Sequence, residues 1–569
     1  MRISFSYAGD FSRQHLTAGL LTLLLSFMGG AQAQTPPAAA VASAHPLATA
    51  AGHEILAAGG NAFDAAVAVS ATLAVVEPTG SGLGGGGFWL LHRAADGFET
   101  MVDGRERAPL AAHRDMYLDA AGEVVPGLSM NGPLAAGIPG EPAALVHIAD
   151  KYGRLPLKQS LAPAIRAARE GFAVDEHYRV LARFRLKHLQ DDAETARIFL
   201  HDNELPPPGH VIKQPELAET LTAIAEHGRD GFYAGKLAQR LVDGVRRGGG
   251  IWTLEDLRQY QVVERAPIRG DYRGMRISSA APPSSGGIAL VTMLNILAGF
   301  ELDQMDETTR IHTIVEAMRR AYRDRAEYLG DSDFVEVPVA MLTHPLYAAG
   351  LRNSIRLDRA TPSRLLPGID HNTPGQDTTH FSILDQDGNR VAATLSINYP
   401  FGAVFIPPGT GVLLNNEMDD FSAKPTVPNA YGLVGAEANA IAPGKRPLSS
   451  MSPTFLETED RVAILGTPGG SRIITMVLLG ALEFAAGRPP LDWVSRPRFH
   501  HQYLPDAIQF EPGAISAGQQ AQLERLGHEL KPMTRRYGDM QSILWHVQAG
   551  RVAAASDPRG GGAARLREH

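Results

Sequence analysis

A polar segment, residues 358–377, divides the chain into two parts of different character. It carries three prolines and two glycines among many polar side chains, which is typical of an exposed loop or linker. The pattern before it is mostly helical, whereas the pattern beyond it is rich in apolar strands. Because helices must cover a β-rich layer in both parts, the chain is predicted to adopt a layered α/β or α+β fold.

The strand-rich part opens with a β-hairpin. Residues 379–385 and 390–397 are β-prone runs on either side of a turn at residues 386–389, which contains an Asp-Gly pair. This turn brings Thr378 within about one residue of pairing with Ser396. Directly opposed residues have Cβ atoms ~4.5–5.5 Å apart. We therefore expect these two hydroxyl side chains to lie close together.

Thr378 stands where the polar segment meets the hairpin. If the chain were cut before it, Thr378 would offer a hydroxyl nucleophile and its own α-amine as a base, since such an amine has a pKa near ~7.7–8.0. Ser396 and Asn398 would then be available to orient the amine. The alternative is that Thr378 and Thr379 are ordinary β-branched strand residues. The local sequence alone favours this alternative.

The other segments predict helices and strands in both parts of the chain. Residues 39–76 predict Ala-rich helices with a break at 59–61, and residues 471–486 predict an apolar helix. The remaining predicted elements are strands at 88–93, 98–102 and 461–465, a mostly helical stretch at 139–300 and a helix at 312–329.

Composition limits the classes of function. The chain has 569 residues, 44% of them apolar, a net charge of −8 and no cysteine. Dominant disorder and disulfides are therefore excluded, as are thiolate nucleophiles and cysteine-held metals. The acidic balance argues against a nucleic-acid partner. The chain is also long for one domain.

The N-terminus has the pattern of a secretory signal. Arg2 and Arg13 precede an apolar run at residues 16–28, which is too short for a membrane span, and a small-residue A-x-A site follows at 31–33. We expect residues 1–33 to be a signal peptide. The mature protein is then expected in the periplasm or outside the cell, with no membrane segment.

Two motifs invite a cofactor or metal interpretation that we do not adopt. Residues 82–87 fit a dinucleotide-binding glycine pattern, but a helix leads in and a strand leaves, which reverses the required order. His500 and His501 would point apart on a strand, and no acidic spacing supports them as metal ligands. We expect no cofactor and no metal ion.

Three further loops carry groups that suit catalysis. The glycines of residues 465–471 join a strand to a helix, where their amides could stabilise an oxyanion. Residues 447–453 gather hydroxyls between prolines, and residues 415–420 gather carboxylates that could hold a substrate ammonium. The ordinary alternatives are a turn between strand and helix, a Ser/Thr turn, and a solvated or calcium-binding acidic loop.

Six longer motifs follow one another along nearly the whole mature chain: GGNAFDAAVA at 59–68, GGGGF at 84–88, TTHFS at 378–382, LNNEMDDFS at 414–422, KRPLSSMSPT at 445–454 and PGGSR at 468–472. In this order they resemble the gamma-glutamyltransferases (gamma-glutamyl transpeptidases), which are N-terminal-nucleophile hydrolases. The resemblance implies an α+β fold, a four-layer αββα sandwich, made from one precursor. It also implies that the precursor cuts itself into a large subunit, residues 34–377, and a small subunit, residues 378–569.

The resemblance implies a reaction sequence at Thr378. Its hydroxyl would attack the carbonyl of Asp377 and so free the Thr378 amine. The same hydroxyl would then take the gamma-glutamyl group from glutathione or a related compound and pass it to water, an amino acid or a peptide. Ser396 stands where a threonine usually bonds the nucleophile, and Gly469 and Gly470 match the amides of the oxyanion hole.

The substrate-binding residues follow from the same resemblance. Arg105 looks like the arginine that grips the substrate α-carboxylate, with the help of Ser449 and Ser450. Guanidinium and carboxylate match as a bidentate pair, which a lysine cannot reproduce. Three residues match the group that holds the α-ammonium: Asn398, Glu417 and Asp420.

Two features bear on the acyl donor. Tyr399 and Pro400 stand where some family members have small polar residues, whereas residues 425–435 resemble the lid loop of bacterial members and favour glutathione. The alternatives are a glutaryl- or cephalosporin-type amidase acylase, and an exported binding protein that keeps the fold but is never cut.

Overall fold

The computed structural model describes residue 4, residues 35–366, 378–424, 429 and 433, and residues 435–568. All the elements below belong to one compact unit, Pro36–His569. The predicted signal peptide, apart from residue 4, and Asp377 lie outside the described residues. Within the described ranges, no helix combines the length and the apolar character that a membrane crossing needs.

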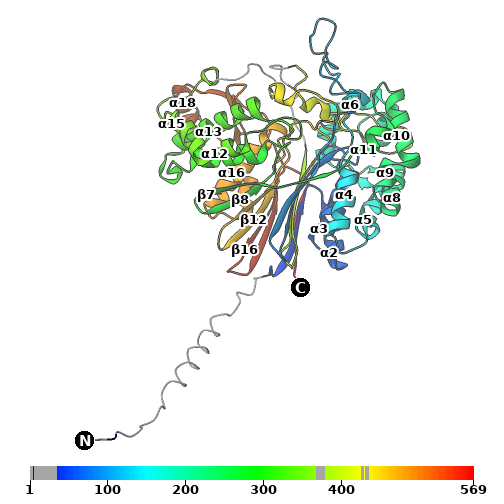
Figure 1. Ribbon diagram of the computed structural model, residues 1–569, viewed down its shortest axis with the longest axis horizontal. Coiled ribbons are helices and arrows are strands. Elements are labelled where there is room, and N and C mark those ends of the chain that lie inside the picture. Colours follow the sequence, from blue (N-terminus) through cyan, green and yellow to red (C-terminus); the bar gives the residue numbers. More distant parts are fainter. Residues whose placement is uncertain are drawn as a thin grey trace. The chain divides into compact units, whose positions relative to one another are not determined.

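Two antiparallel sheets lie at the centre of this unit, with helices on the outer side of each (Figure 1). The seven-stranded sheet has the order β18 (Ala563–Glu568), β1 (Ala38–Ser43), β9 (Thr379–Leu384), β10 (Arg390–Ser396), β2 (Gly86–Arg93), β3 (Phe98–Gly104), β6 (Val263–Arg265). The six-stranded sheet has the order β17 (Arg551–Ser556), β16 (Gln541–His546), β12 (Arg461–Gly466), β11 (Thr454–Glu457), β8 (Met275–Ser279), β7 (Ile268–Tyr272). The predicted α+β class is confirmed.

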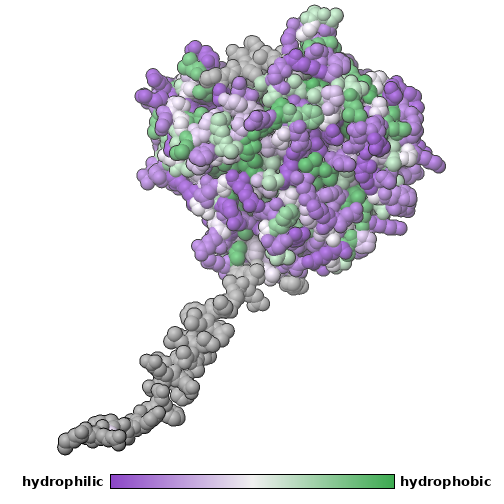
Figure 2. All heavy atoms as spheres, viewed as in Figure 1, coloured by the Kyte–Doolittle hydropathy of each residue, from purple (hydrophilic) through white to green (hydrophobic). Residues whose placement is uncertain are grey.

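Each sheet has its own set of helices. Beside the seven-stranded sheet lie α2 (Pro46–Ala57), α3 (Ala62–Val76), α4 (Glu141–Tyr152), α5 (Leu157–Glu170), α6 (Glu176–Asp191), α8 (Pro215–His227), α9 (Asp230–Tyr233), α10 (Gly235–Arg247) and α11 (Leu254–Gln259). Beside the six-stranded sheet lie α12 (Gly286–Leu297), α13 (Glu307–Tyr328), α15 (Pro345–Asn353), α16 (Ile473–Ala485) and α18 (Ala517–Arg525). Figure 2 shows hydrophilic and hydrophobic residues interspersed over the visible face of the molecule.

The central strands of the seven-stranded sheet, β1, β9 and β10 and most of β2, are buried on both faces. On β2, Phe88 and Leu90 join the core shared with the six-stranded sheet, whereas Trp89 and Leu91 join the core formed with α3 and α5. Successive side chains of a strand point to opposite faces. The sequence of a strand that lies between two cores is therefore a continuous apolar run. Burial of each large side chain contributes about 1.5–3 kcal/mol.

One predicted helix is partly wrong. Residues 39–43, which were expected to belong to the first Ala-rich helix, form most of β1 (Ala38–Ser43) between β18 and β9. All six of its residues are buried. The small alanine side chains fit a strand that is covered on both faces, so tertiary packing overrides the helix propensity of alanine.

The predicted helical stretch at 139–300 is also wrong in one place. Residues 263–279 form β6, β7 and β8. The turn between β7 and β8 contains Arg273 and Gly274, both with positive φ, as a tight hairpin requires. This Arg-Gly turn is a weaker signal than Asp-Gly, and the strands beside it are short and partly polar.

The other predicted elements are confirmed within a few residues. The strands at 88–93, 98–102 and 461–465 are β2, β3 and β12, and the helices at 312–329 and 471–486 correspond to α13 and α16. The glycine tract at 82–87 follows α3 and enters β2, which is the order that argues against dinucleotide binding.

Strands from the two sides of the predicted cut alternate in the seven-stranded sheet. β18, β9 and β10 come after residue 377, whereas β1, β2, β3 and β6 come before it. β1 lies between β18 and β9, so it pairs with later strands on both edges. Two chain segments that are far apart in sequence therefore depend on each other for their hydrogen bonds.

Candidate active site

Thr378 lies at the end of the central hairpin, as predicted. Thr379 is opposite Leu395 in the β9–β10 register, and the next pair in this register is Thr378 with Ser396. Thr378 is 6% exposed and Ser396 is 3% exposed. The predicted register is confirmed. It places two hydroxyl groups side by side beneath the surface.

A small cavity of about 20 Å³ lies against Thr378. That is room for about one water molecule. Apart from Gly469 and Glu417, every described residue that we predicted for the site lines this cavity, although the residues come from six separate segments. The lining consists of Arg105, Thr378, Ser396, Asn398, Asp420, Leu433, Ser449, Ser450, Met451, Gly470, Ser471 and Ile473.

Arg105 is held by carboxylates on two sides. It follows β3, and its NH1 donates to Glu417 Oε2 at 2.5 Å while its NH2 donates to Asp420 Oδ2 at 2.6 Å. Its Nε donates to the carbonyl of Pro447 at 3.2 Å. The Arg105 side chain is 1% exposed. Such a desolvated guanidinium is a strong partner for carboxylates because it is shielded from water.

Burial and neighbouring charges shift the pKa values of the glutamates around Arg105. Burial is the main cause that raises the pKa of Glu417 to about 7; Asp420 raises it further, and Arg105 opposes the rise. Burial also raises the pKa of Glu106 well above its usual value, with a contribution from Glu417. Clusters of buried carboxylates beside a cation are frequent at functional sites. We take Asp420 and Glu417 as the carboxylates that balance Arg105.

Ser396 and Asn398 connect the hairpin to this charged group. The Ser396 hydroxyl accepts a bond from the Asn398 backbone N–H at 2.7 Å, and it also bonds the side chain of Glu417. The Asn398 side chain donates to the carbonyl of Asn416 at 2.9 Å. Asn398 has a φ of 73°, a left-handed conformation that asparagine tolerates better than most residues.

Gly469 and Gly470 lie where the strand β12 passes into α16. Their φ angles are 139° and 55°, and a Cβ on Gly469 would lie 2.5 Å from the Met476 side chain. The conformation of Gly469 therefore requires glycine, and that of Gly470 favours it. Gly470 begins a short 3-10 turn that continues into α16. Backbone N–H groups at such a helix start are suited to holding an oxyanion.

Two residues near the site were not predicted. Arg325 on α13 is 4% exposed, donates to Ser450 Oγ at 3.3 Å and to Ser285 Oγ at 3.0 Å. Burial lowers its pKa to about 10, although Asp420 opposes this. Arg325 lies inside a long charged helix, where nothing in the sequence separates it from the arginines around it.

Glu77 is the second residue that was missed. It accepts a bond from the Thr379 hydroxyl at 2.6 Å. Glu77, Thr378 and Gly469 also line a larger cavity of about 610 Å³. Thr378 therefore stands between a small cavity that Arg105 lines and a larger cavity that would admit solvent or a second substrate. A lone glutamate before Pro78 carries no signal of this role.

Some predicted features fall elsewhere. Asp377 and most of the predicted lid loop lie outside the described residues, although Leu433 lines the small cavity and Asn429 donates to Asp420 Oδ1 at 3.3 Å. His500 bonds Thr475 on α16, whereas His501 bonds Asp506 in the loop before β14 (Ala507–Phe510). The two histidine rings therefore have separate partners in the interior.

The fold places the chain in a structural class. A cephalosporin acylase from Bacillus halodurans has a crystal structure that matches this chain with a TM-score of 0.82 and 29% sequence identity, over 99% of each chain. The class is therefore that of an α+β fold shared with an acylase.

The sequence comparisons narrow this class to a family. The family model described as Gamma-glutamyltranspeptidase matches residues 48–566, and the chain belongs to this family. A "Glutathione hydrolase proenzyme" from Pseudomonas sp. (strain A14) is 43% identical over 529 residues, covering 91% of each chain. The protein of the same name from Escherichia coli (strain K12) is 43% identical over 527 residues, covering 91% of this chain and 90% of its own. The predicted family and enzyme class are confirmed; the roles of single residues stay predictions.

Proposed function

We propose that this protein is a self-processing gamma-glutamyltransferase and glutathione hydrolase whose nucleophile is Thr378. The observation that carries the proposal is the position of the Thr378 hydroxyl at a cavity that also contains Arg105 and Asp420. The names of the relatives, glutathione hydrolase proenzymes, support both the substrate and a precursor form. The proposed fold type is the αββα sandwich of N-terminal-nucleophile hydrolases.

Maturation would begin at the bond before Thr378. The Thr378 hydroxyl attacks the carbonyl carbon of Asp377, the peptide C–N bond breaks, and the Thr378 nitrogen takes the proton to become a free amine. Water then hydrolyses the resulting ester. The products are a large subunit, residues 34–377, and a small subunit, residues 378–569, which remain together as a heterodimer.

Catalysis would use the same hydroxyl. Thr378 Oγ attacks the γ-carbonyl of the substrate amide while the free α-amine accepts its proton and delivers it to the leaving amine. The N–H groups of Gly469 and Gly470 would hold the oxyanion, a contribution of about 3–4 kcal/mol for each well-placed donor. Water or the amine of an amino acid or peptide then cleaves the acyl-enzyme ester.

Substrate recognition would depend on charges of both signs. Arg105, Ser449 and Ser450 would hold the α-carboxylate of the glutamyl group. Asn398, Glu417 and Asp420 would hold its α-ammonium. Because Arg105 bonds Glu417 and Asp420 directly, a zwitterionic substrate would replace these ion pairs by equivalent ones. No net charge would then be buried without a partner.

The decisive experiment is the variant Thr378→Ala. It should leave one uncut and inactive chain, whereas the wild type should give bands of roughly 37 and 21 kDa, from the shares of the 60.9 kDa chain. N-terminal sequencing of the smaller band should read Thr-Thr-His-Phe-Ser. A Thr378→Ala protein that is cut and active would disprove the proposal.

Thr379→Val is the matched control because it changes the adjacent threonine on the same strand and keeps its shape. It should still be cut, although it loses the bond to Glu77. Thr378→Ser should keep the cut and part of the activity, since it retains the hydroxyl. A wild type that stays intact and binds gamma-glutamyl compounds without turnover would instead favour the exported binding protein.

The alternative substrate class is that of a glutaryl- or cephalosporin-type amidase acylase. The structural likeness to a cephalosporin acylase supports it. A glutaryl donor lacks the α-ammonium that Glu417 and Asp420 would bind, so these carboxylates favour the gamma-glutamyl donor over it. Gamma-glutamyl and glutaryl anilides should separate the two, and faster cleavage of the glutaryl anilide would select the acylase.

The proposal includes export. The apolar run at 16–28 and the small-residue site at 31–33 would direct the precursor out of the cytoplasm and be removed. The enzyme would then act on glutathione and gamma-glutamyl compounds in the periplasm or outside the cell. N-terminal sequencing of the large subunit, which should begin at Gln34, tests this part separately.

A further inference from the structure

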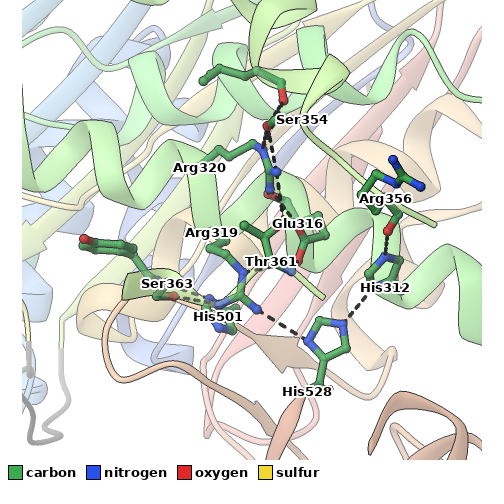
Figure 3. Close-up of polar contacts among 12 residues, drawn as sticks. His312, Glu316, Arg319, Arg320, Ser354, Arg356, Thr361, Ser363, His501 and His528 are labelled. Carbon is green, nitrogen blue, oxygen red and sulfur yellow. Dashed lines mark hydrogen bonds and ion pairs between the residues drawn. The ribbon is translucent and has the colours of Figure 1, made fainter. Parts of the chain in front are cut away.

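A buried polar cluster lies away from the candidate active site, between α13 and the segment that leads to the predicted cut (Figure 3). We call residues 356–366 the tail segment. In the proposed large subunit, only residues 367–377 follow them. Three side chains of α13 face it, and all are nearly fully buried: His312, Glu316 and Arg319. The partners beyond them come from the later part of the chain: His501, Asp506 and His528.

The backbone of the tail segment is bonded at its centre. Thr361 N donates to Glu316 Oε1 at 3.0 Å, and Ser363 N donates to Asp506 Oδ2 at 2.7 Å. Arg319 donates to Ser363 Oγ at 2.7 Å and pairs with Asp506 and Glu316. Asp506 belongs to the proposed small subunit, so it ties the end of one subunit directly to the other.

Both ends of the tail segment are bonded as well. His312 Nε2 lies 2.8 Å from the carbonyl of Arg356, and Tyr503 donates to the carbonyl of Leu366 at 3.3 Å. Between them, Ala360 N donates to the carbonyl of Leu526 at 2.6 Å. The contacts are therefore spread along the whole segment, and three of the partners, Tyr503, Asp506 and Leu526, follow residue 378.

The histidines of the cluster form a directional chain of hydrogen bonds. A carbonyl only accepts, so His312 Nε2 carries the proton toward Arg356, and His312 Nδ1 accepts from His528 Nε2 at 2.7 Å. His528 Nδ1 is then an acceptor for Arg319 NH2 at 3.5 Å. Burial lowers the pKa of His528 to about 3 and that of His501 to about 4, so both rings are neutral at neutral pH.

A metal ion is a poorer explanation of this cluster. One nitrogen of His312, one of His528 and a Glu316 oxygen lie within 4.8 Å of one another, which is close enough to share an ion. However, Glu316 already pairs with Arg319 and with Arg320 at 2.6 Å. A divalent cation would lie beside two guanidinium groups and would break the bond between the two histidines.

We propose that this cluster is a tail clamp: Glu316, Arg319 and Asp506 hold the tail segment in place and thereby position the peptide bond before Thr378 for self-cleavage. The inference rests on the proposed function, because it requires a cut at Thr378. Without these bonds the centre of the tail segment could move, and the Asp377 carbonyl would less often lie where the Thr378 hydroxyl can attack it.

The test follows cleavage of the full chain during cell-free synthesis, by electrophoresis at timed intervals. Asp506→Asn keeps the shape of the side chain but removes its negative charge. It also replaces one acceptor oxygen of the carboxylate with an NH2 group, which cannot accept a hydrogen bond. It should slow the cut several-fold, because the bonds at the centre of the tail segment are weakened. Ser363→Ala, a milder change that leaves the Ser363 N–H bonded to Asp506, should slow it less. If Asp506→Asn does not fold, the cleavage rate of Ser363→Ala tests the clamp instead.

Glu483→Gln is the matched control. Glu483 is a carboxylate of the proposed small subunit that likewise pairs with an arginine, Arg496, away from the tail segment. It should be cut at the rate of the wild type. The activity per cut molecule should be the same in all variants, because the clamp touches neither Thr378 nor Arg105.

A second readout examines the tail segment after the cut. Trypsin should trim the large subunit after Arg359 and Arg364 in Asp506→Asn, whereas both sites should resist in the wild type and in Glu483→Gln. Equal cleavage rates for Asp506→Asn and the wild type would overturn the clamp, as would equal slowing of Glu483→Gln. An uncut wild type would overturn the proposed function as well, so the two failures are distinguishable.

Discussion

The guanidinium of Arg105 connects the two carboxylates of the candidate site, those of Glu417 and Asp420. Arg105 reaches Glu417 and Asp420 through different nitrogens, and its backbone is fixed by Tyr260, whose hydroxyl donates to the Arg105 carbonyl at 2.7 Å. A planar, five-donor group can make both contacts at once, and it could exchange them for a bidentate contact with a substrate carboxylate. The binding specificity proposed for the site therefore depends on shape as much as on charge.

Arg105→Lys tests this dependence. One ammonium cannot span both carboxylates, so at least one buried negative charge loses its partner, a change that costs about 3–5 kcal/mol. We expect kcat/KM for a gamma-glutamyl anilide to fall at least about 100-fold, mostly through KM.

The control for this variant is Arg265→Lys. Arg265 is paired with Asp103 and Asp333 outside the small cavity, so its replacement should leave KM within a few-fold of the wild type. A normal KM in Arg105→Lys would show that Arg105 does not bind the substrate.

Prediction of the site from sequence succeeded where motifs were long. Thr378, the paired glycines and the acidic loop lie in motifs that resemble a known family, and the hairpin register could be counted from its turn. Arg325 and Glu77 could not be found in this way. They reach the site through helix packing and a loop, and the sequence around them has no periodicity that marks an inward charge.

At the scale of elements, the glycine tract is a packing device. A Cβ on Gly85 would lie 2.2 Å from the carbonyl oxygen of Ser396, and one on Gly86 would lie 2.2 Å from that of Gly104. These neighbours are backbone atoms, which cannot rotate away. The tract therefore lets β2 and the segment before it approach β10 closely enough to set the position of Ser396.

Gly85→Ala should disturb both the fold and the site. The clash is with backbone, so we expect a loss of about 3 kcal/mol or more in the free energy of unfolding, together with slower self-cleavage. Urea denaturation and electrophoresis of the soluble fraction measure the two effects.

Gly97→Ala provides the comparison at an exposed turn. Gly97 has a φ of 68°, and a Cβ added there would meet no atom within 4 Å. Only the backbone conformation therefore resists the change, at about 1 kcal/mol. If Gly85→Ala were no more damaging than Gly97→Ala, the close approach would not matter.

The elements themselves were predictable to different degrees. Long apolar segments and the Asp-Gly hairpin were found because their periodicity and turns are strong. β1 was missed because alanine favours helices, and only its place between β9 and β18 makes it a strand. β6, β7 and β8 were missed because they are short and their outward side chains are polar.

At the scale of the whole molecule, buried titratable groups of opposite kind affect stability. Glu141 is fully buried, and burial raises its pKa well above the usual value. Burial lowers the pKa of His380 to about 3. The first group favours the folded state at low pH and the second favours it at neutral pH, because each is neutral in the fold.

Glu141→Gln should therefore stabilise the protein increasingly as the pH rises. In the wild type, Glu141 is protonated in both the folded and the unfolded state below about pH 4.5, so it costs no stability there. As the pH rises, only the unfolded state releases the proton, and the free energy of unfolding falls by up to about 1.4 kcal/mol per pH unit. The neutral glutamine removes this loss. Urea midpoints at pH 5, 6 and 7 measure the difference from the wild type.

His380→Gln should show the opposite trend. Unfolded histidine binds a proton below about pH 6.5 whereas buried His380 does not, so the wild type loses stability as the pH falls from 6.5 toward 3. The variant should lack this loss. Equal trends in the two variants would contradict the assignment of the neutral states.

The alternation of strands in the seven-stranded sheet has a consequence for genetics. If the chain is cut before Thr378, β1 stays enclosed by β18 and β9 of the other fragment, so the fragments cannot part without unfolding the sheet. Each molecule then keeps the two halves of the one polypeptide from which it was made. Two alleles with defects in different halves would not complement each other in the same cell, because their products never trade partners.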